Sequence, residues 1–179
     1  MQVLTGRMLR AAKLEVSLYE EVEADPTAMT QSMTVVVLSA VAAGLGSARH
    51  AGVGGLLIVT IVALAGWYLW AFLTYWIGTR LLPEPTTRAD YGELLRTIGF
   101  SSAPGIIRVL GIIPGLAGIV SLVAAVWMLI AMVIAVRQAL DFTSTPRAVG
   151  VCLIGWIVQA LLLAAVLGMF GWGITGRPV

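Results

Sequence analysis

The sequence predicts an all-α polytopic membrane protein: a five-helix transmembrane bundle preceded by an N-terminal amphipathic interfacial helix. Hydrophobic residues make up 59% of its 179 positions and charged residues only 11%, whereas soluble domains carry roughly 25% charged residues. Long apolar windows recur along the chain, and basic residues gather between alternate windows. These three observations exclude a soluble enzyme, a disordered chain and a protein that binds nucleic acid.

The first predicted unit covers residues 1–26 and is an amphipathic helix on the cytoplasmic face of the membrane. Apolar side chains recur at helical spacing from Leu4 to Tyr19. The opposite side carries the basic residues Arg7, Arg10 and Lys13. This stripe predicts contact with anionic lipid phosphates, and docking of a partner protein onto the helix is the alternative. Pro26 follows an acidic run and predicts a helix stop and restart.

The transmembrane unit covers residues 27–172, and a short tail follows at 173–179. A membrane-crossing helix needs about 20 mainly apolar residues. Five windows meet or approach this length: 33–47 with a possible start at 27, 53–82, 98–114, 116–136 and 149–170. Pro104 and Pro114 interrupt the third window, so a re-entrant segment packed against protein is the alternative there.

The distribution of basic residues favours five crossings, because Lys and Arg concentrate in cytoplasmic loops. With a cytoplasmic N-terminus, eight basic residues lie inside: Arg7, Arg10, Lys13, Arg80, Arg88, Arg96, Arg137 and Arg147. Two lie outside, Arg49 and Arg177. A re-entrant third segment changes the ratio to six against four. We therefore expect a multi-pass protein of the cell inner membrane with its C-terminus outside, and the acidic region before the first span argues against a cleavable signal peptide.

The end of the second window is dense in aromatic residues. Trp67, Trp70 and Trp76 are expected to form an interfacial belt that contacts lipid or a partner. The alternative is a flat surface for a pigment, a quinone or an acyl chain. Small residues also recur four apart, as in Ala40 with Gly44, Ala51 with Gly55 and Gly111 with Gly115. Such pairs favour close helix packing in lipid, within the chain first and between chains second.

Two polar side chains fall inside predicted spans. Arg108 lies in the third span and Gln159 in the fifth. A guanidinium inside the membrane is costly unless it is paired, reaches the headgroups or faces water. We expect Arg108 to be satisfied by a partner within the protein or by a lipid phosphate, with contact to Gln159 as one possibility. A substrate or ion role for Arg108 is the alternative.

No catalytic residue, cofactor site or metal site is predicted. The single cysteine, Cys152, excludes an internal disulfide and a multi-thiolate metal site. The single histidine, His50, lies in the first outside loop and is expected to be solvated, with ligation of a chlorin magnesium or a haem iron as the alternative. Motifs for nucleotide binding, serine hydrolysis or zinc hydrolysis do not occur.

Several stretches are similar to one known family. They are DYGELLRTIGFSSAP at 90–104, VLGIIPG at 109–115, RQALD at 137–141, the aromatic close at 67–78 and the acidic stretch at 19–26. Together they resemble the prokaryotic branch of the Yip1 family. The resemblance implies a five-span bundle with a cytosolic N-terminus. Its eukaryotic members serve vesicle trafficking and associate with prenylated Rab GTPases, and no site residue is carried over.

The sequence therefore favours a non-enzymatic integral membrane scaffold or assembly protein of the Yip1 family, which packs against other membrane proteins or shapes the bilayer. The expected partners are membrane lipids and either other integral membrane proteins or further copies of the chain. One alternative is an accessory subunit of a large bacterial energy-transducing complex that contacts pigment, quinone or lipid. A third reading is a small transporter for an anionic substrate, bound by Arg108.

Overall fold

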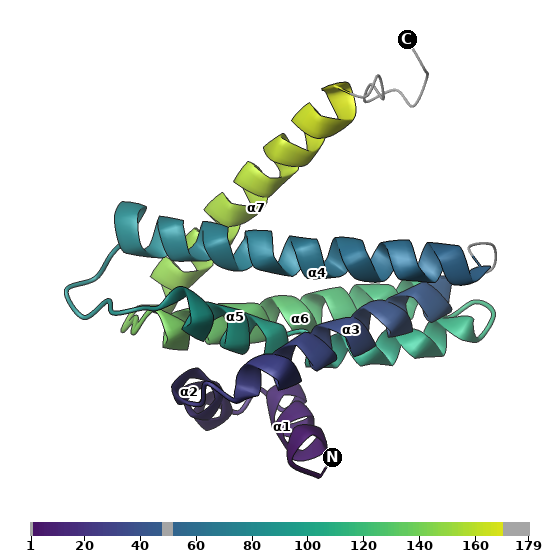
Figure 1. The fold of residues 1–179 in the computed structure, drawn as a ribbon, viewed down its shortest axis with the longest axis horizontal. Coiled ribbons are helices and arrows are strands. Elements are labelled where there is room, and N and C mark those ends of the chain that lie inside the picture. The colour runs from purple at the N-terminus through teal and green to yellow at the C-terminus, as the bar shows by residue number, and fades with distance from the viewer. Residues whose placement is uncertain (1, 48–51, 170–179) are drawn as a thin grey trace.

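The structure is a computed structural model that describes residues 2–47 and 52–169. Helices and short turns account for these residues (Figure 1). The elements in chain order are α1 (Gln2–Ala12), α2 (Val16–Ala24), α3 (Ala28–Ser47), α4 (Gly52–Trp76), the π-helix η1 (Ile77–Leu81), α5 (Tyr91–Phe100), the 3-10 helix η2 (Ala103–Ile112), α6 (Ala117–Ala139) and α7 (Thr145–Met169).

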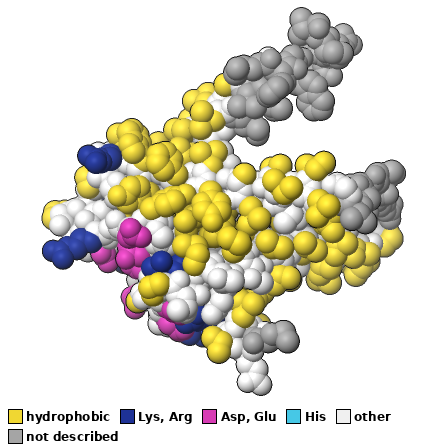
Figure 2. All heavy atoms as spheres, viewed as in Figure 1, with side chains coloured by type: hydrophobic (Ala, Val, Ile, Leu, Met, Phe, Trp, Pro, Cys, Tyr) yellow, Lys and Arg dark blue, Asp and Glu magenta, His cyan; other side chains and the backbone are white. Residues whose placement is uncertain are grey.

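The long helices form a bundle with two attachments. Helices α3, α4 and α6 run lengthwise beside one another, while α7 starts within the bundle and leaves it at an angle (Figure 1). Helices α1 and α2 lie together against one side, near the start of α3 (Figure 1). Charged side chains gather around α1, α2 and the loop between α4 and α5, and apolar side chains cover much of the rest of the face in Figure 2.

Four helices among the described residues are long and apolar enough to cross a membrane. They cover Ala28–Gly46, Gly54–Leu81, Ala117–Ala139 and Thr145–Leu162. The predicted all-helical class and four of the predicted spans are thereby confirmed. The predicted count of five is not confirmed, because the third window is not one α-helix. It contains the end of α5, a turn at Ser101 and Ser102, and the 3-10 helix η2, which begins with Pro104 in its first turn.

A line of small residues joins α3 to the α5–η2 segment, and we call it the glycine–serine seam. On α3 it consists of Ser32, Ser39 and Gly46, and on α5–η2 it consists of Gly99, Gly105 and Gly111. The spacing is seven on α3, which is close to two turns at 3.6 residues per turn. The spacing is also regular on the facing segment, at six residues, and from Gly105 to Gly111 within η2 this is two turns at three residues per turn. Ser32, Ser39 and Gly46 therefore keep to one face of α3, and Gly105 and Gly111 keep to one face of η2, while Gly99 faces Ser32 from the end of α5.

The two sides of the seam are in close contact at both of its ends. The Ser32 hydroxyl donates to the backbone carbonyl of Arg96 over 2.9 Å, and a Cβ atom placed on Gly99 would lie 2.6 Å from Ser32 Cβ. A Cβ on Gly111 would lie 2.8 Å from the carbonyl oxygen of Gly46. Side chains are therefore excluded at both ends of the seam, and η2 reaches the end of α3 that is remote from α2.

The N-terminal region is a helical hairpin and not the single predicted amphipathic helix. The chain turns at residues 13–15, where Leu14 adopts a left-handed φ of 63° and the Glu15 N–H donates to the Arg10 carbonyl over 3.1 Å. This hydrogen-bond pattern is a helix C-cap, usually built on glycine. Tyr19 is fully buried in a cluster that includes Phe100 and Ala135. The hairpin thus packs against α5 and α6 through its apolar side.

Candidate functional site

The two intramembrane polar residues predicted from the sequence line the same groove. Arg108 comes from η2 and Gln159 from α7, and both border a groove of about 530 Å³. Helices α3, α4 and α6 complete its walls. A groove of this size lies within the range of about 300–1,000 Å³ that is typical of small-molecule sites.

The backbone of Arg108 packs closely against α3. Its carbonyl group lies directly against Gly46 on α3, where a Cβ atom would collide with it. The side chain is partly buried. Within residues 2–47 and 52–169 its guanidinium makes no hydrogen bond or ion pair, so the predicted protein partner is not found there. The predicted contact with Gln159 is not formed either, although both side chains border the groove.

The walls of the groove are mainly apolar and aromatic. Trp67 and Trp70 on α4 are only 6% and 5% exposed, and Met132 on α6 lies beside them. The Trp67 indole N–H donates to the Leu95 carbonyl over 3.0 Å. The Trp70 indole N–H faces the Met132 sulfur at 3.1 Å. Both rings are therefore fixed in orientation and turn apolar surface toward the groove.

The three tryptophans of the predicted aromatic belt occupy different environments. Trp67 and Trp70 are buried within the bundle, whereas Trp76 is 48% exposed on the surface. The two buried rings point inward because Leu95 and Met132 supply partners for their N–H groups. Contact of these residues with lipid or a partner remains a prediction.

The groove carries few reactive groups. The hydroxyl-bearing residues on its lining are Ser39 and Ser102, and no acidic residue lines it among those that the structure describes. No group of three or more His, Cys, Asp or Glu residues that could hold a metal ion occurs in the described ranges. The arrangement can therefore bind an apolar group and an anion, and it brings together no acid–base pair.

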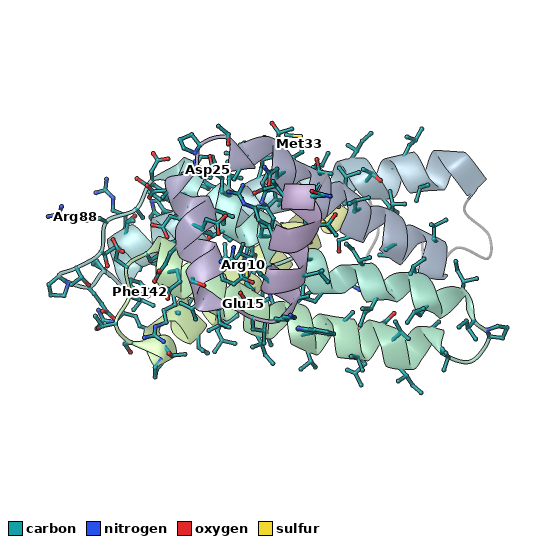
Figure 3. All side chains as sticks on the ribbon, turned by 90° about the horizontal axis from the view of Figure 1, so that it is seen from below. Arg10, Glu15, Asp25, Met33, Arg88 and Phe142 are labelled. Carbon is teal, nitrogen blue, oxygen red and sulfur yellow. The ribbon has the colours of Figure 1, made fainter. Side chains whose placement is uncertain are left out.

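The basic residues of the predicted stripe engage acidic groups within the hairpin. Arg7 pairs with Glu21 and Asp25, each over 2.9 Å. Arg10 pairs with Glu15 over 3.0 Å and also with Glu21. In Figure 3, Arg10 and Glu15 lie close together at the turn between α1 and α2, whereas Arg88 projects from the distant loop. Lys13 is exposed.

The lipid contact predicted for Arg7, Arg10 and Lys13 remains a prediction. The ion pairs also change the acidity of the hairpin's carboxyl groups. Hydrogen bonds from Arg10 and Arg7 lower the pKa of Glu21 below its ordinary value. Hydrogen bonds from Thr27 and Arg7 do the same to the pKa of Asp25. The hairpin is therefore stabilised by charges within it.

Arg96 anchors the hairpin to the bundle, a role that the sequence reasoning missed. It is 8% exposed, and its guanidinium donates to the backbone carbonyls of Val22, over 2.9 Å, and Glu23. Its helix α5 begins with a capping box formed by Asp90 and Glu93. That box is readable in the sequence, but the partners of Arg96 lie more than 70 residues away and leave no local signal.

Glu23 has an unusual environment beside this anchor. Burial, together with the carboxylates of Glu93 and Asp141, raises its pKa from the ordinary value of 4.5 to about 7, and Arg96 opposes the shift. The group therefore gains a proton near neutral pH. Glu23 lies in the last turn of α2, and its backbone carbonyl accepts from Arg96, so this proton is gained directly beside the anchor.

Arg49, His50 and Arg177 lie outside the described residues, and so does the tail at 173–179. The expectations placed on them remain expectations. Among the described residues, the free cysteine Cys152 is buried in the core between α4, α6 and α7.

Comparison with protein families gives one match. The Yip1 domain matches residues 17–167, from α2 to the last turns of α7. The match includes the groove, the glycine–serine seam and the second helix of the hairpin. No curated protein and no solved structure matches the chain.

Proposed function

The chain belongs to the Yip1 family, and from that premise we propose that this multi-pass membrane protein is a non-enzymatic scaffold that associates with other membrane helices through α7. Association with a second copy of the chain is the simplest form of this function. The supporting observation is the position of α7. Its first half packs on the bundle through Ala148, Val151 and Cys152, and the second half extends away from it (Figure 1).

The extending half of α7 has a surface suited to helix association. Ala160, Ala164 and Gly168 are exposed and recur at four-residue intervals. Small residues at this spacing let two helix backbones approach closely in lipid, where van der Waals packing drives association. Large exposed side chains at Ile157 and Leu161 flank them. A partner helix would therefore find both a close-packing line and apolar side chains on α7.

A hollow between α6 and α7 adds to this surface. It has a volume of about 360 Å³ and apolar walls that include Val133, Leu153 and Trp156. A large apolar side chain from a partner helix would fill it. The groups described in the groove and the hollow support binding and not catalysis, which is why we propose a scaffold in preference to an enzyme.

The test compares two neighbouring alanines on α7. Ala164→Ile places a branched side chain on the small-residue line, whereas Ala165→Ile places the same side chain one residue away. We expect the wild-type chain and Ala165→Ile to form a complex of discrete mass in lipid nanodiscs, measured by native mass spectrometry, and Ala164→Ile to dissociate. A wild-type chain that remains a single copy with no bound protein would contradict the proposal.

We also propose that α5 and η2 together form a fifth crossing, with the N-terminus in the cytoplasm and the chain in the cell inner membrane. Ten α-helical residues and ten 3-10 residues advance about 35 Å, which exceeds the hydrocarbon thickness of about 30 Å. The seam supports this reading because it keeps the α5–η2 segment beside α3 from Ser32 to Gly46. The bias of basic residues toward one side supports the orientation.

A further inference from the structure

We propose that the groove beside Arg108 is a binding site for one anionic phospholipid, with the lipid phosphate on Arg108 and one acyl chain lying along α4. This inference goes beyond the scaffold function and does not depend on it. It rests on the charge of Arg108 in the groove, the length of the apolar wall and the helix α7 that borders it.

The positive charge of Arg108 favours an anionic ligand in the groove. Its guanidinium has five N–H donors, and among the described residues it donates to none of the available acceptors. The groove lining described above contains no carboxylate to neutralise it. Gln159 borders the same groove and offers an amide N–H₂ group. A phosphate placed between the two side chains would satisfy both.

The depth of Arg108 fits a lipid headgroup. The residue lies four positions before the end of η2 at Ile112, so its Cα atom is about 8 Å inside that end at a rise of 2.0 Å per residue. A long arginine side chain spans much of such a distance and places its charge near the headgroup level. A phosphate at the membrane surface is therefore within its reach.

The length of the groove fits an acyl chain. Its lining on α4 runs from Ile58 to Trp70, which corresponds to about 18 Å at a rise of 1.5 Å per residue. One leaflet accounts for about half of a hydrocarbon core of about 30 Å. The wall contains Val62 and Trp67, and Met132 faces it from α6. An acyl chain would thus pass from the charged end toward the middle of the membrane.

The helix that leaves the bundle borders the groove. Trp156 and Gln159 border it from α7, the helix that leaves the bundle at an angle in Figure 1. Inorganic phosphate would leave the apolar wall uncovered, and a neutral quinone would leave the guanidinium without an anion. A phospholipid with a net negative charge satisfies both parts of the site.

The test uses the full-length chain in nanodiscs and measures bound lipid by native mass spectrometry. We compare dioleoylphosphatidylglycerol with dioleoylphosphatidylcholine, which carries the same acyl chains on a zwitterionic headgroup. We expect one retained phosphatidylglycerol molecule and a higher melting temperature in that lipid. Equal retention of the two lipids would overturn the proposal, and so would equal stabilisation by inorganic phosphate in detergent.

Three variants locate the site. Arg108→Gln should weaken retention of phosphatidylglycerol by about tenfold to a hundredfold, which is the range expected for loss of a charge-assisted hydrogen bond. Arg80→Gln removes the same charge from an exposed position outside the groove and should retain the lipid. Gly66→Leu should displace the acyl chain, because Gly66 lines the groove and has open space around its Cβ position. Retention of phosphatidylglycerol by both groove variants, Arg108→Gln and Gly66→Leu, would overturn the proposal.

Discussion

The indole N–H of Trp127 on α6 donates to the backbone carbonyl of Ala12, the last residue of α1, over 2.8 Å. The final carbonyls of a helix lack partners within the helix. One of them is satisfied here by a side chain 115 residues away. This contact attaches the end of α1 to a membrane-length helix, whereas Arg96 holds the last turn of α2.

Loss of this contact should loosen α1. We expect Trp127→Phe to destabilise the docked hairpin by about 1 kcal/mol, the net contribution of a typical hydrogen bond. Amide hydrogen exchange in residues 2–12 should then be about fivefold faster. Trp76→Phe is the control, because the Trp76 ring is exposed. Unchanged exchange in α1 of Trp127→Phe would show that the other contacts of the hairpin hold α1 without this hydrogen bond.

Protonation of Glu23 should stabilise the fold. Its pKa of about 7 in the folded chain exceeds its ordinary value of 4.5, so the folded state binds the proton more tightly than the unfolded state. Stability therefore falls as pH rises from about 4.5 to about 7. We expect Glu23→Gln to raise the melting temperature at pH 8 and to flatten this part of the pH profile. A Glu23→Gln profile that keeps the wild-type slope between about pH 4.5 and about pH 7 would contradict this assignment.

The glycine–serine seam should tolerate no added methyl group where α3 meets the backbone of η2. A Cβ atom on Gly46 would collide with the backbone carbonyl of Arg108. We expect Gly46→Ala to destabilise the bundle by about 1–3 kcal/mol, as overpacking does. Gly118→Ala meets nothing within 4 Å and should change stability by less than about 1 kcal/mol. Unfolding in mixed detergent micelles measures both, and equal values would contradict a tight seam.

The Tyr19 hydroxyl should be dispensable. It is buried and lacks a hydrogen-bond partner among the described residues, and burial raises its pKa above the ordinary value. Tyr19→Phe removes an unsatisfied polar atom and should stabilise the chain by about 1 kcal/mol. Tyr91→Phe is the matched change, because the Tyr91 hydroxyl donates to the Tyr68 carbonyl over 2.9 Å. Thermal unfolding should move in opposite directions for the two variants.

Labelling of single cysteines tests the proposed fifth crossing. In a Cys152→Ala background, Thr86→Cys lies in the loop before α5 and Ile113→Cys lies just after η2. If α5 and η2 cross the membrane, a membrane-impermeant maleimide applied to whole cells should label Ile113→Cys, and should label Thr86→Cys only after permeabilisation. Labelling of both positions from one side would establish a re-entrant segment.

Hydropathy was sufficient to predict the four long helices. The window 116–136 corresponds to α6 at Ala117–Ala139, and the window 53–82 corresponds to α4 followed by η1. The alternative start at 27 is close to the observed start of α3 at Ala28. These elements follow from the length and apolar character that a bilayer requires, so local sequence is enough to find them.

The seam shows a feature of the third window that hydropathy does not predict, namely that part of it is a 3-10 helix. The sequence pairs Gly111 with Gly115 only if the segment is α-helical, because that pairing assumes residues four apart on one face. In the 3-10 helix the residues that share a face are three and six apart, and Gly105 and Gly111 are the pair that faces α3. Hydropathy does not distinguish the two helix types. The turn between α1 and α2 was not predicted either, because Leu14 occupies a helix C-cap position at which glycine is the usual residue.

The ten residues of η2 would have a different length and a different twist if they formed an α-helix. Six residues turn through two full rotations in a 3-10 helix, but through only about 600° in an α-helix. Conversion of η2 to an α-helix would therefore rotate Gly111 about 120° away from Gly46 and shorten the segment by about 5 Å. The same conversion would turn Arg108 by about 60° around the helix axis relative to Gly105. Contact with α3 thus fixes the winding of η2, and the winding decides which way the only arginine of that helix faces.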